Sequence, residues 1–319
     1  MTSPPFFGFH MPSFSFPGVA DADRFEHLAG LALAAEEAGF DLVTVMDHFY
    51  QIHGVGPEEE PMLEAYTTLG ALAARTTRVS LGTMVTGVTY RNPAVLAKQV
   101  TTLDTISAGR AILGLGAAWN EDEHRGYGID FPPIGERMDR LEEALRICRL
   151  MFDEERPSFS GRHYRINRAL NRPRPVRPGG PPILIGGSGE KRTLRLVAQY
   201  ADIANWFGDL ETLRHKTEVF ERHCEVVGRD PDDVLRTIMA PVVLVESDAE
   251  ADGVLASLPE ARRASTSAVT PARAAELLQP YLDAGFRGFI LRNPTMLTVD
   301  RIQLAGELIR LMAGTRSAV

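Results

Sequence analysis

Short runs of β-branched and aromatic residues alternate with amphipathic stretches along the chain. In 21–38, for example, Phe25, Leu28, Ala32 and Ala35 recur near helical spacing, and Gly39 follows as a helix stop. The pattern predicts strands at Phe6–Met11, Asp41–Val45, Val79–Val85, Ala111–Gly116, Ile183–Gly187, Asp202–Phe207, Arg236–Val245 and Gly288–Leu291. Predicted helices follow at 21–38, 64–75, 93–106, 135–152, 190–200, 210–227, 271–284 and 299–312. Eight such pairs imply a parallel sheet and favour a closed (β/α)8 TIM barrel, one domain over 1–319, rather than a doubly wound sheet.

Two segments interrupt this alternation. Arg156–Pro182, after the fourth unit, holds seven arginines and six prolines, and its middle alternates apolar and polar residues as a small hairpin would. Val245–Thr270 is rich in Ala, Asp, Glu and Ser and lengthens the seventh unit. We therefore expect excursions from the barrel after units four and seven.

The composition excludes several classes of protein. The 319 residues carry 34 Lys+Arg against 42 Asp+Glu, a formal net charge of −8, which is opposite to the basic bias of most nucleic-acid binders. No apolar run reaches the length needed to cross a bilayer, and no basic residue precedes Arg24 as a signal peptide would require. The two cysteines, Cys148 and Cys224, form no disulfide framework, so we expect a cytoplasmic protein without a membrane or nucleic-acid partner.

In a barrel of this kind, reactive residues gather at the carboxyl ends of the strands. At the predicted strand ends stand His10-Met11, Asp47-His48-Phe49, Thr83-Met84-Val85, Ala117-Ala118-Trp119-Asn120, Gly186-Gly187-Ser188-Gly189, Asn205-Trp206, Val245-Glu246 and Arg292-Asn293. His48, beside an acid, is either a satisfied polar residue or a site residue for proton transfer. No His, Cys and carboxylate cluster has metal-ligand spacing, so no metal site is expected.

The glycine-rich turn Gly186-Gly187-Ser188-Gly189 joins a predicted strand to a predicted helix. Glycines let backbone N–H groups approach an anion, and a helix start adds unpaired donors. Ser188 can add a hydroxyl and Lys191 or Arg192 a full charge, so we favour a phosphate site here over a tight turn in which Ser188 caps the helix. The other glycine run, Gly114-Leu115-Gly116, does not complete GxGxxG, which excludes a dinucleotide site of the Rossmann type.

Several of these segments, in this order and spacing, resemble the bacterial luciferase-like flavin superfamily in its coenzyme F420-dependent branch. They are Asp47-His48-Phe49, 81–86, 91–94, 104–110, Gly114–Trp119, Tyr127-Gly128 and 186–190. The resemblance implies a luciferase-like barrel that binds F420, with Asp47 and His48 near the deazaflavin ring as catalytic residues. It implies a non-prolyl cis peptide at Thr83–Met84, a cofactor phosphate on Gly187, Ser188 and Gly189, and a ring lined by Ala117, Ala118, Trp119 and Asn120. His10, Phe49, Asn205 and Trp206 would form the substrate pocket, and a homodimer is expected.

One departure from that pattern bears on the substrate. The sugar-phosphate dehydrogenases of this branch carry a Gly-Glu pair just after the GxG strand, where this chain has Ala118-Trp119. Glu121 and Glu123 follow at other positions, so a sugar phosphate is disfavoured and the general acid is unassigned, with His124 and Tyr127 as possible donors.

The sequence thus predicts an oxidoreductase that moves a hydride between F420 and a small-molecule substrate. An FMN-dependent luciferase-like monooxygenase is the first alternative, and a non-catalytic flavin-binding protein is the second. Arginines between Arg162 and Arg177 could attract the carboxylates of the F420 tail, although a solvated crossover explains them more simply.

Overall fold

The computed structural model describes residues 4–258, 260–292 and 296–314, and its central sheet closes into a barrel. Eight parallel strands form the barrel: β1 (Phe6–Met11), β2 (Leu42–Val45), β3 (Ser80–Thr83), β5 (Ala111–Gly116), β8 (Ile183–Gly186), β9 (Ile203–Trp206), β10 (Leu235–Met239) and β13 (Gly288–Leu291). The β3–β5 pairing, with Leu81 opposite Ala111, closes the ring. The predicted (β/α)8 barrel is confirmed.

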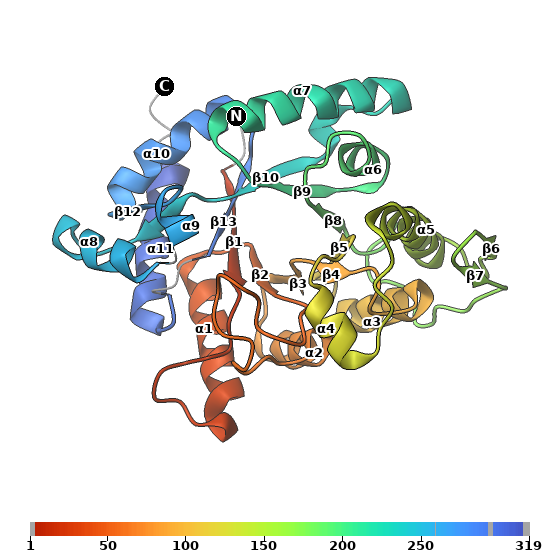
Figure 1. The fold of residues 1–319 in the computed structure, drawn as a ribbon, viewed down its shortest axis with the longest axis horizontal. Coiled ribbons are helices and arrows are strands. Elements are labelled where there is room, and N and C mark those ends of the chain that lie inside the picture. The colour runs from red at the N-terminus through yellow and green to blue at the C-terminus, as the bar shows by residue number, and fades with distance from the viewer. Residues whose placement is uncertain (1–3, 259, 293–295, 315–319) are drawn as a thin grey trace.

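One helix follows each barrel strand and lies outside the ring (Figure 1). These helices are α1 (Arg24–Ala38), α2 (Ala65–Arg75), α3 (Pro93–Ile106), α5 (Ile134–Asp153), α6 (Thr193–Tyr200), α7 (Leu210–Val227), α10 (Pro271–Asp283) and α11 (Val299–Gly314). Three of their starts are capped, because the side chains of Glu64, Asn92 and Asp209 accept backbone N–H groups of the first turn. None of the helices in the described part of the chain could span a membrane.

The two excursions take different forms. The first holds β6 (Phe159–Ser160) and β7 (Arg165–Ile166), an antiparallel hairpin as predicted. The second holds β11 (Val242–Leu244), α8 (Asp248–Ser257), α9 (Glu260–Arg263) and β12 (Ser267–Val269), with β11 and β12 paired in parallel. The prediction of one strand over 236–245 is wrong, because Ala240-Pro241 separates β10 from β11 and proline cannot donate to a strand ladder.

Two further elements at the carboxyl end of the barrel were not predicted: β4 (Thr86–Gly87) and α4 (Glu121–Tyr127). The strand alternation explains the core. Leu42, Ile112, Leu184, Ile203 and Ile290 point inward and fill the barrel, while their neighbours pack against the helices. The amino end of the barrel is therefore plugged, and an open cavity is possible only at the carboxyl end.

Glu36, near the end of α1, ties that helix to the start of β3. Its buried carboxylate accepts hydrogen bonds from the backbone N–H groups of Thr77, Arg78 and Val79 and from the Thr77 hydroxyl, at 2.5–3.2 Å. Burial opposes ionisation, but these donors outweigh it and lower the pKa of Glu36 to about 2. This contact fixes the segment that leads into β3.

Candidate active site

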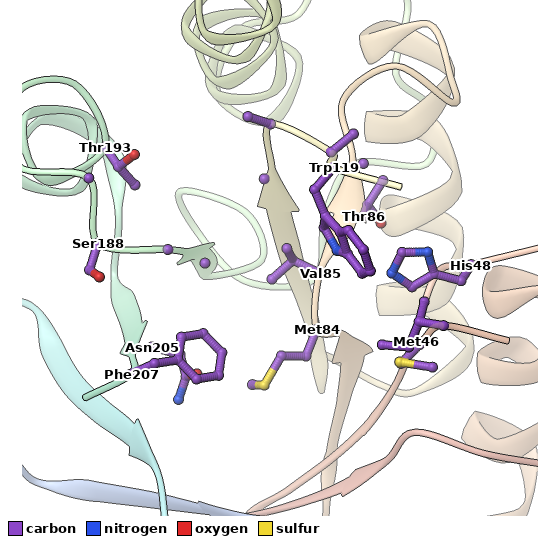
Figure 2. Close-up of a pocket in the computed structure, with 18 of the residues that line it drawn as sticks. Met46, His48, Met84, Val85, Thr86, Trp119, Ser188, Thr193, Asn205 and Phe207 are labelled. Carbon is purple, nitrogen blue, oxygen red and sulfur yellow. The ribbon is translucent and has the colours of Figure 1, made fainter. Parts of the chain in front are cut away.

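A cavity of about 430 Å³ lies at the carboxyl end of the barrel strands. Figure 2 shows its two sides, with Ser188 and Thr193 on one side and His48 and Trp119 on the other. Met84, Val85, Asn205 and Phe207 lie between them. The remaining lining residues are His10, Met46, Ile52, Thr86, Gly87, Tyr90, Gly116, Ala117, Ala118, Ile134, Met138, Gly186, Gly187, Gly189, Met239 and Arg292. Asn293, from the predicted strand ends, falls outside the described residues.

The floor of the cavity is a bulge that follows β3, and glycines on the neighbouring strands make room for it. A Cβ on Gly114 would lie 1.9 Å from the carbonyl oxygen of Thr83. A Cβ on Gly116 would lie 2.8 Å from Val85 Cγ2, and one on Gly186 would lie 3.1 Å from the same side chain. The Gly114-Leu115-Gly116 run therefore serves the shape of the floor.

The bulge contains a non-prolyl cis peptide, as the resemblance implies, but at a different bond. It joins Met84 and Val85 rather than Thr83 and Met84. Thr83 is buried and does not line the cavity, because its hydroxyl bonds to the Gly114 carbonyl at 3.2 Å and to the Thr86 hydroxyl at 2.9 Å. The residues of the bulge that do line the cavity are Met84, Val85 and Thr86.

The glycine-rich turn lines the cavity from Gly186 to Gly189. Gly187 has φ 97°, a left-handed conformation that favours glycine. The helix after the turn begins at Thr193 rather than at Glu190. Lys216 of α7 donates to the Ser188 carbonyl oxygen at 2.9 Å and so holds the turn from behind.

The basic residues of the turn do not lie where the sequence suggests. Lys191 is exposed and does not line the cavity, so its place beside the phosphate stays a prediction. The Arg192 guanidinium points to α5, where it binds Asp139 Oδ1 at 2.5 Å and the Gly135 carbonyl at 3.0 Å. The turn therefore faces the cavity with backbone groups and the Ser188 side chain rather than with a lysine or Arg192.

His48 lines the opposite side, and a buried carboxylate holds it. His48 Nδ1 lies 2.6 Å from Oε1 of Glu123, whose side chain is fully buried in α4. Glu123 also accepts the Phe49 backbone N–H at 2.7 Å and the Tyr90 hydroxyl. Burial opposes ionisation of Glu123, but the hydrogen bonds from His48, Tyr90 and Phe49 lower the pKa of its carboxyl.

Asp47 lies behind this side and does not line the cavity. Its buried carboxylate forms two hydrogen bonds with the Arg91 guanidinium, at 2.5 and 3.0 Å, and Arg91 also reaches Glu64 at 2.6 Å. Burial raises the pKa of the Asp47 carboxyl, and the Arg91 charge opposes that shift. Asp47 is thus placed to support the strand end rather than to touch a ligand.

The residues after β5 separate into two groups. Ala117, Ala118 and Trp119 line the cavity, and the Trp119 indole, 57% exposed, meets the His48 ring edge-on with centroids 5.6 Å apart. Asn120 does not line it; it faces an outer groove with Gln51 and Asp122.

Asn205 and Trp206 are neighbours on β9 and so face opposite sides of the barrel wall. Asn205 faces the cavity, whereas Trp206 is fully buried outside the barrel against Phe220 and Phe286. The assignment of Trp206 to the pocket wall is therefore wrong. His10 lines the cavity, with Nδ1 2.9 Å from the Thr44 hydroxyl oxygen.

A family model of known proteins matches residues 5–294, and its description is luciferase-like monooxygenase. The chain belongs to the luciferase-like monooxygenase family. An F420-dependent glucose-6-phosphate dehydrogenase of Nakamurella multipartita is 31% identical over 332 aligned positions, covering 93% of this chain and 96% of the relative. One of Kineococcus radiotolerans is 39% identical over 178 residues, which are 53% of this chain and 50% of that relative.

Among solved structures, an F420-dependent secondary alcohol dehydrogenase in complex with an F420-acetone adduct superposes with a TM-score of 0.81 at 21% identity. The match covers 97% of this luciferase-like chain and 99% of that one, and it supports the barrel fold.

Sequence reasoning missed part of this luciferase-like site. Glu123 binds His48 and Tyr90 binds Glu123. Glu123 lies in a short helix and Tyr90 in a loop, and the hydrophobic pattern of the sequence predicts neither contact. Phe49 does not line the cavity as the sequence predicts, because its ring packs on Tyr90 and Tyr127. Of the two donors considered, His124 is buried between Thr89 and the Asn120 carbonyl, and Tyr127 is 58% exposed.

None of the arginines of the first excursion is among the residues that line the cavity. The Arg174 guanidinium binds the carbonyl oxygens of Phe152 and Glu154 at the end of α5, and Arg172 pairs with Glu155. For Arg172 and Arg174, these contacts favour the solvated-crossover interpretation over capture of a cofactor tail.

Proposed function

We propose that this protein is an F420-dependent oxidoreductase that transfers a hydride between F420 and a small organic substrate. One observation carries the proposal: a glycine-rich turn and His48 face each other across an apolar floor in the cavity at the strand ends. Such a site can hold an anionic group at one end and move a proton at the other. The F420-dependent names of the curated relatives support this choice of cofactor.

The residues present fit the deazaflavin cofactor. Asn205 Nδ2 donates to the Thr237 hydroxyl oxygen at 2.9 Å, and that hydroxyl donates to the Ala204 carbonyl at 2.8 Å. This chain of donors fixes the amide, so Asn205 Oδ1 is the free acceptor, and it has no partner among the described residues. A buried acceptor without a partner is costly. An N–H or O–H group of the cofactor or substrate would satisfy it.

Three groups of residues would hold the cofactor. Gly186–Gly189 and Thr193 would take the phosphate through backbone N–H groups and hydroxyls. Met84, Val85 and Met239 offer apolar surface to a flat ring, and Ala117, Ala118 and Trp119 border the same space. When bound, F420 accepts or supplies the hydride, and the protein contributes binding, orientation and exclusion of water.

His48 is the residue we assign to proton transfer. Its ring borders the cavity beside Trp119, and the carboxylate of Glu123 balances a positive charge on the imidazole. Trp119 and Phe207 are large, partly exposed side chains at the edge of the cavity and would limit the access of water. The ion pair between Asp47 and Arg91 would fix the backbone after β2, which carries His48.

The cavity argues against a sugar phosphate as the substrate. Its described lining has no carboxylate, and Arg292 is its one arginine or lysine. A sugar phosphate bound beside F420 would bring a second phosphate into a mostly apolar space, at a high desolvation cost. The relatives are named as glucose-6-phosphate dehydrogenases, which favours a sugar phosphate, so glucose 6-phosphate belongs among the substrates tested.

The experiment is an anaerobic assay with oxidised and reduced F420 against alcohols, ketones, conjugated carbonyl compounds and glucose 6-phosphate. We expect turnover with at least one apolar substrate and none with glucose 6-phosphate. Turnover with glucose 6-phosphate alone would refute the substrate assignment, and oxygen-dependent turnover with reduced FMN alone would favour the monooxygenase alternative. Tight F420 binding without any turnover would favour the non-catalytic alternative.

We also propose a cytoplasmic homodimer. The two cysteines are free and buried, and burial raises the pKa of Cys148 to about 12 and that of Cys224 to about 11, so both thiols are unreactive. Free thiols suit a reducing compartment. The dimer is testable by light scattering of the purified protein, where a monomer mass would contradict it.

A further inference from the structure

Glu123 is a buried carboxylate at the centre of the contacts around His48. Its Oε1 lies 2.6 Å from His48 Nδ1 and also accepts the Tyr90 hydroxyl, while Oε2 accepts the Phe49 backbone N–H at 2.7 Å. These donors come from two loops that lie more than 30 residues away along the chain, and two of the three residues, His48 and Tyr90, line the cavity. Glu123 itself does not line it.

An ionised carboxylate only accepts hydrogen bonds. The Nδ1 atom of His48 must therefore carry the proton, and in the neutral ring the other nitrogen, Nε2, then holds a lone pair. Because Nδ1 is occupied by Glu123, Nε2 is the nitrogen left for a ligand in the cavity. The ring is held on a second side by the edge-on contact with Trp119.

We propose that Glu123 is a positioning residue that fixes His48 in the Nδ1–H tautomer, with Nε2 presented to the substrate as a proton acceptor. This inference rests on the proposed function for its catalytic meaning. The proton step is balanced within the site. A substrate O–H bond breaks, its proton bonds to Nε2, and the imidazolium keeps its Nδ1 proton and is neutralised by Glu123. In the reverse direction the same Nε2–H returns the proton.

The Glu123→Gln variant makes a sharp test, because the surroundings determine how the amide must lie. The Phe49 N–H cannot reverse its direction, so the glutamine oxygen must take the place of Oε2. The amide NH2 group then takes the place of Oε1 and faces His48 Nδ1 and Tyr90. As a donor it requires Nδ1 to accept, which moves the proton of the neutral ring to Nε2.

The tautomer is read by 15N NMR of histidine-labelled protein at alkaline pH, with His48 assigned from the signal that is missing in His48→Gln. We expect the Nδ1–H form in the wild type and the Nε2–H form in Glu123→Gln. We also expect kcat/KM to fall about 100-fold or more, with F420 affinity within about threefold. Glu123→Asp, which keeps an acceptor, should restore the Nδ1–H form and part of the activity.

Glu121→Gln is the matched control, because Glu121 lies on the same helix with its side chain exposed and paired to Arg125. It should change neither the tautomer nor kcat/KM. The Nε2–H form in the wild type, or an unchanged tautomer and rate in Glu123→Gln, would overturn the proposal. The NMR measurement needs neither cofactor nor turnover, so it gives an answer even if the protein fails to use F420, which would refute only the proposed function.

Discussion

Gly114 of β5 gives the most direct test of how the cavity floor is built. An alanine there would place its Cβ 1.9 Å from the Thr83 carbonyl oxygen, whereas real Cβ contacts are essentially never closer than 3.0 Å. The clash is with backbone, so no side-chain rotation relieves it. The Thr83 carbonyl or the β5 backbone must move by about 1 Å, and Met84 and Val85 would move with it.

Overpacking of this kind costs about 1–3 kcal/mol and sometimes more. We therefore expect Gly114→Ala to lower the free energy of unfolding by about 3 kcal/mol, measured by chemical denaturation. We also expect its Kd for F420 to rise at least about tenfold, which corresponds to about 1.4 kcal/mol. The control is Gly70→Ala in α2, where an added Cβ meets nothing within 4 Å and alanine gains up to about 1 kcal/mol in helix propensity. Wild-type stability and affinity in Gly114→Ala would refute the role given to this glycine.

Three further predictions concern the barrel and the turn. The pKa of Glu36 is lowered from 4.5 to about 2, so this carboxylate contributes up to about 3 kcal/mol of stability that is present above pH 4.5 and lost as the pH falls through about 2. In urea titrations, the free energy of unfolding of Glu36→Gln should be lower than that of the wild type at pH 7 and equal to it near pH 2. A difference in unfolding free energy of the same size at both pH values would contradict this. Ser188→Asp should weaken F420 binding by charge repulsion, as measured by fluorescence titration, and unchanged affinity would move the phosphate elsewhere. Lys216→Ala should raise the Kd for F420 about tenfold, because it removes the hydrogen bond to the Ser188 carbonyl oxygen. Lys191→Ala should leave the Kd unchanged. A larger rise in Kd for Lys191→Ala than for Lys216→Ala would show that Lys191 contacts the cofactor.

The sequence was sufficient for the barrel because each unit repeats a strong local signal. Runs such as Ala111–Gly116 are apolar on both faces, which is typical of parallel strands covered by helices, and a helix follows each of them along the chain. The predicted strand over 236–245 is too long, because the chain leaves the barrel at Pro241 although the residues on both sides of it are apolar.

The site was harder to predict because it depends on orientation and on contacts between distant segments. Asn205 and Trp206 both stand at a strand end, and only the register decides that one faces the cavity and the other the helices. Lys191 is adjacent to the turn in sequence, but the lysine that holds the turn is Lys216, 28 residues from Ser188. Glu123 lies 75 residues from His48, and no spacing rule joins them.

The central claim is that this cavity binds F420 and uses it for hydride transfer. The most direct measurement is a titration of the purified protein with F420, FMN and NADPH under identical conditions. We predict saturable binding of F420 that is weakened by Ser188→Asp, with no comparable binding of the other two. Binding of FMN alone, without affinity for F420, would contradict the account.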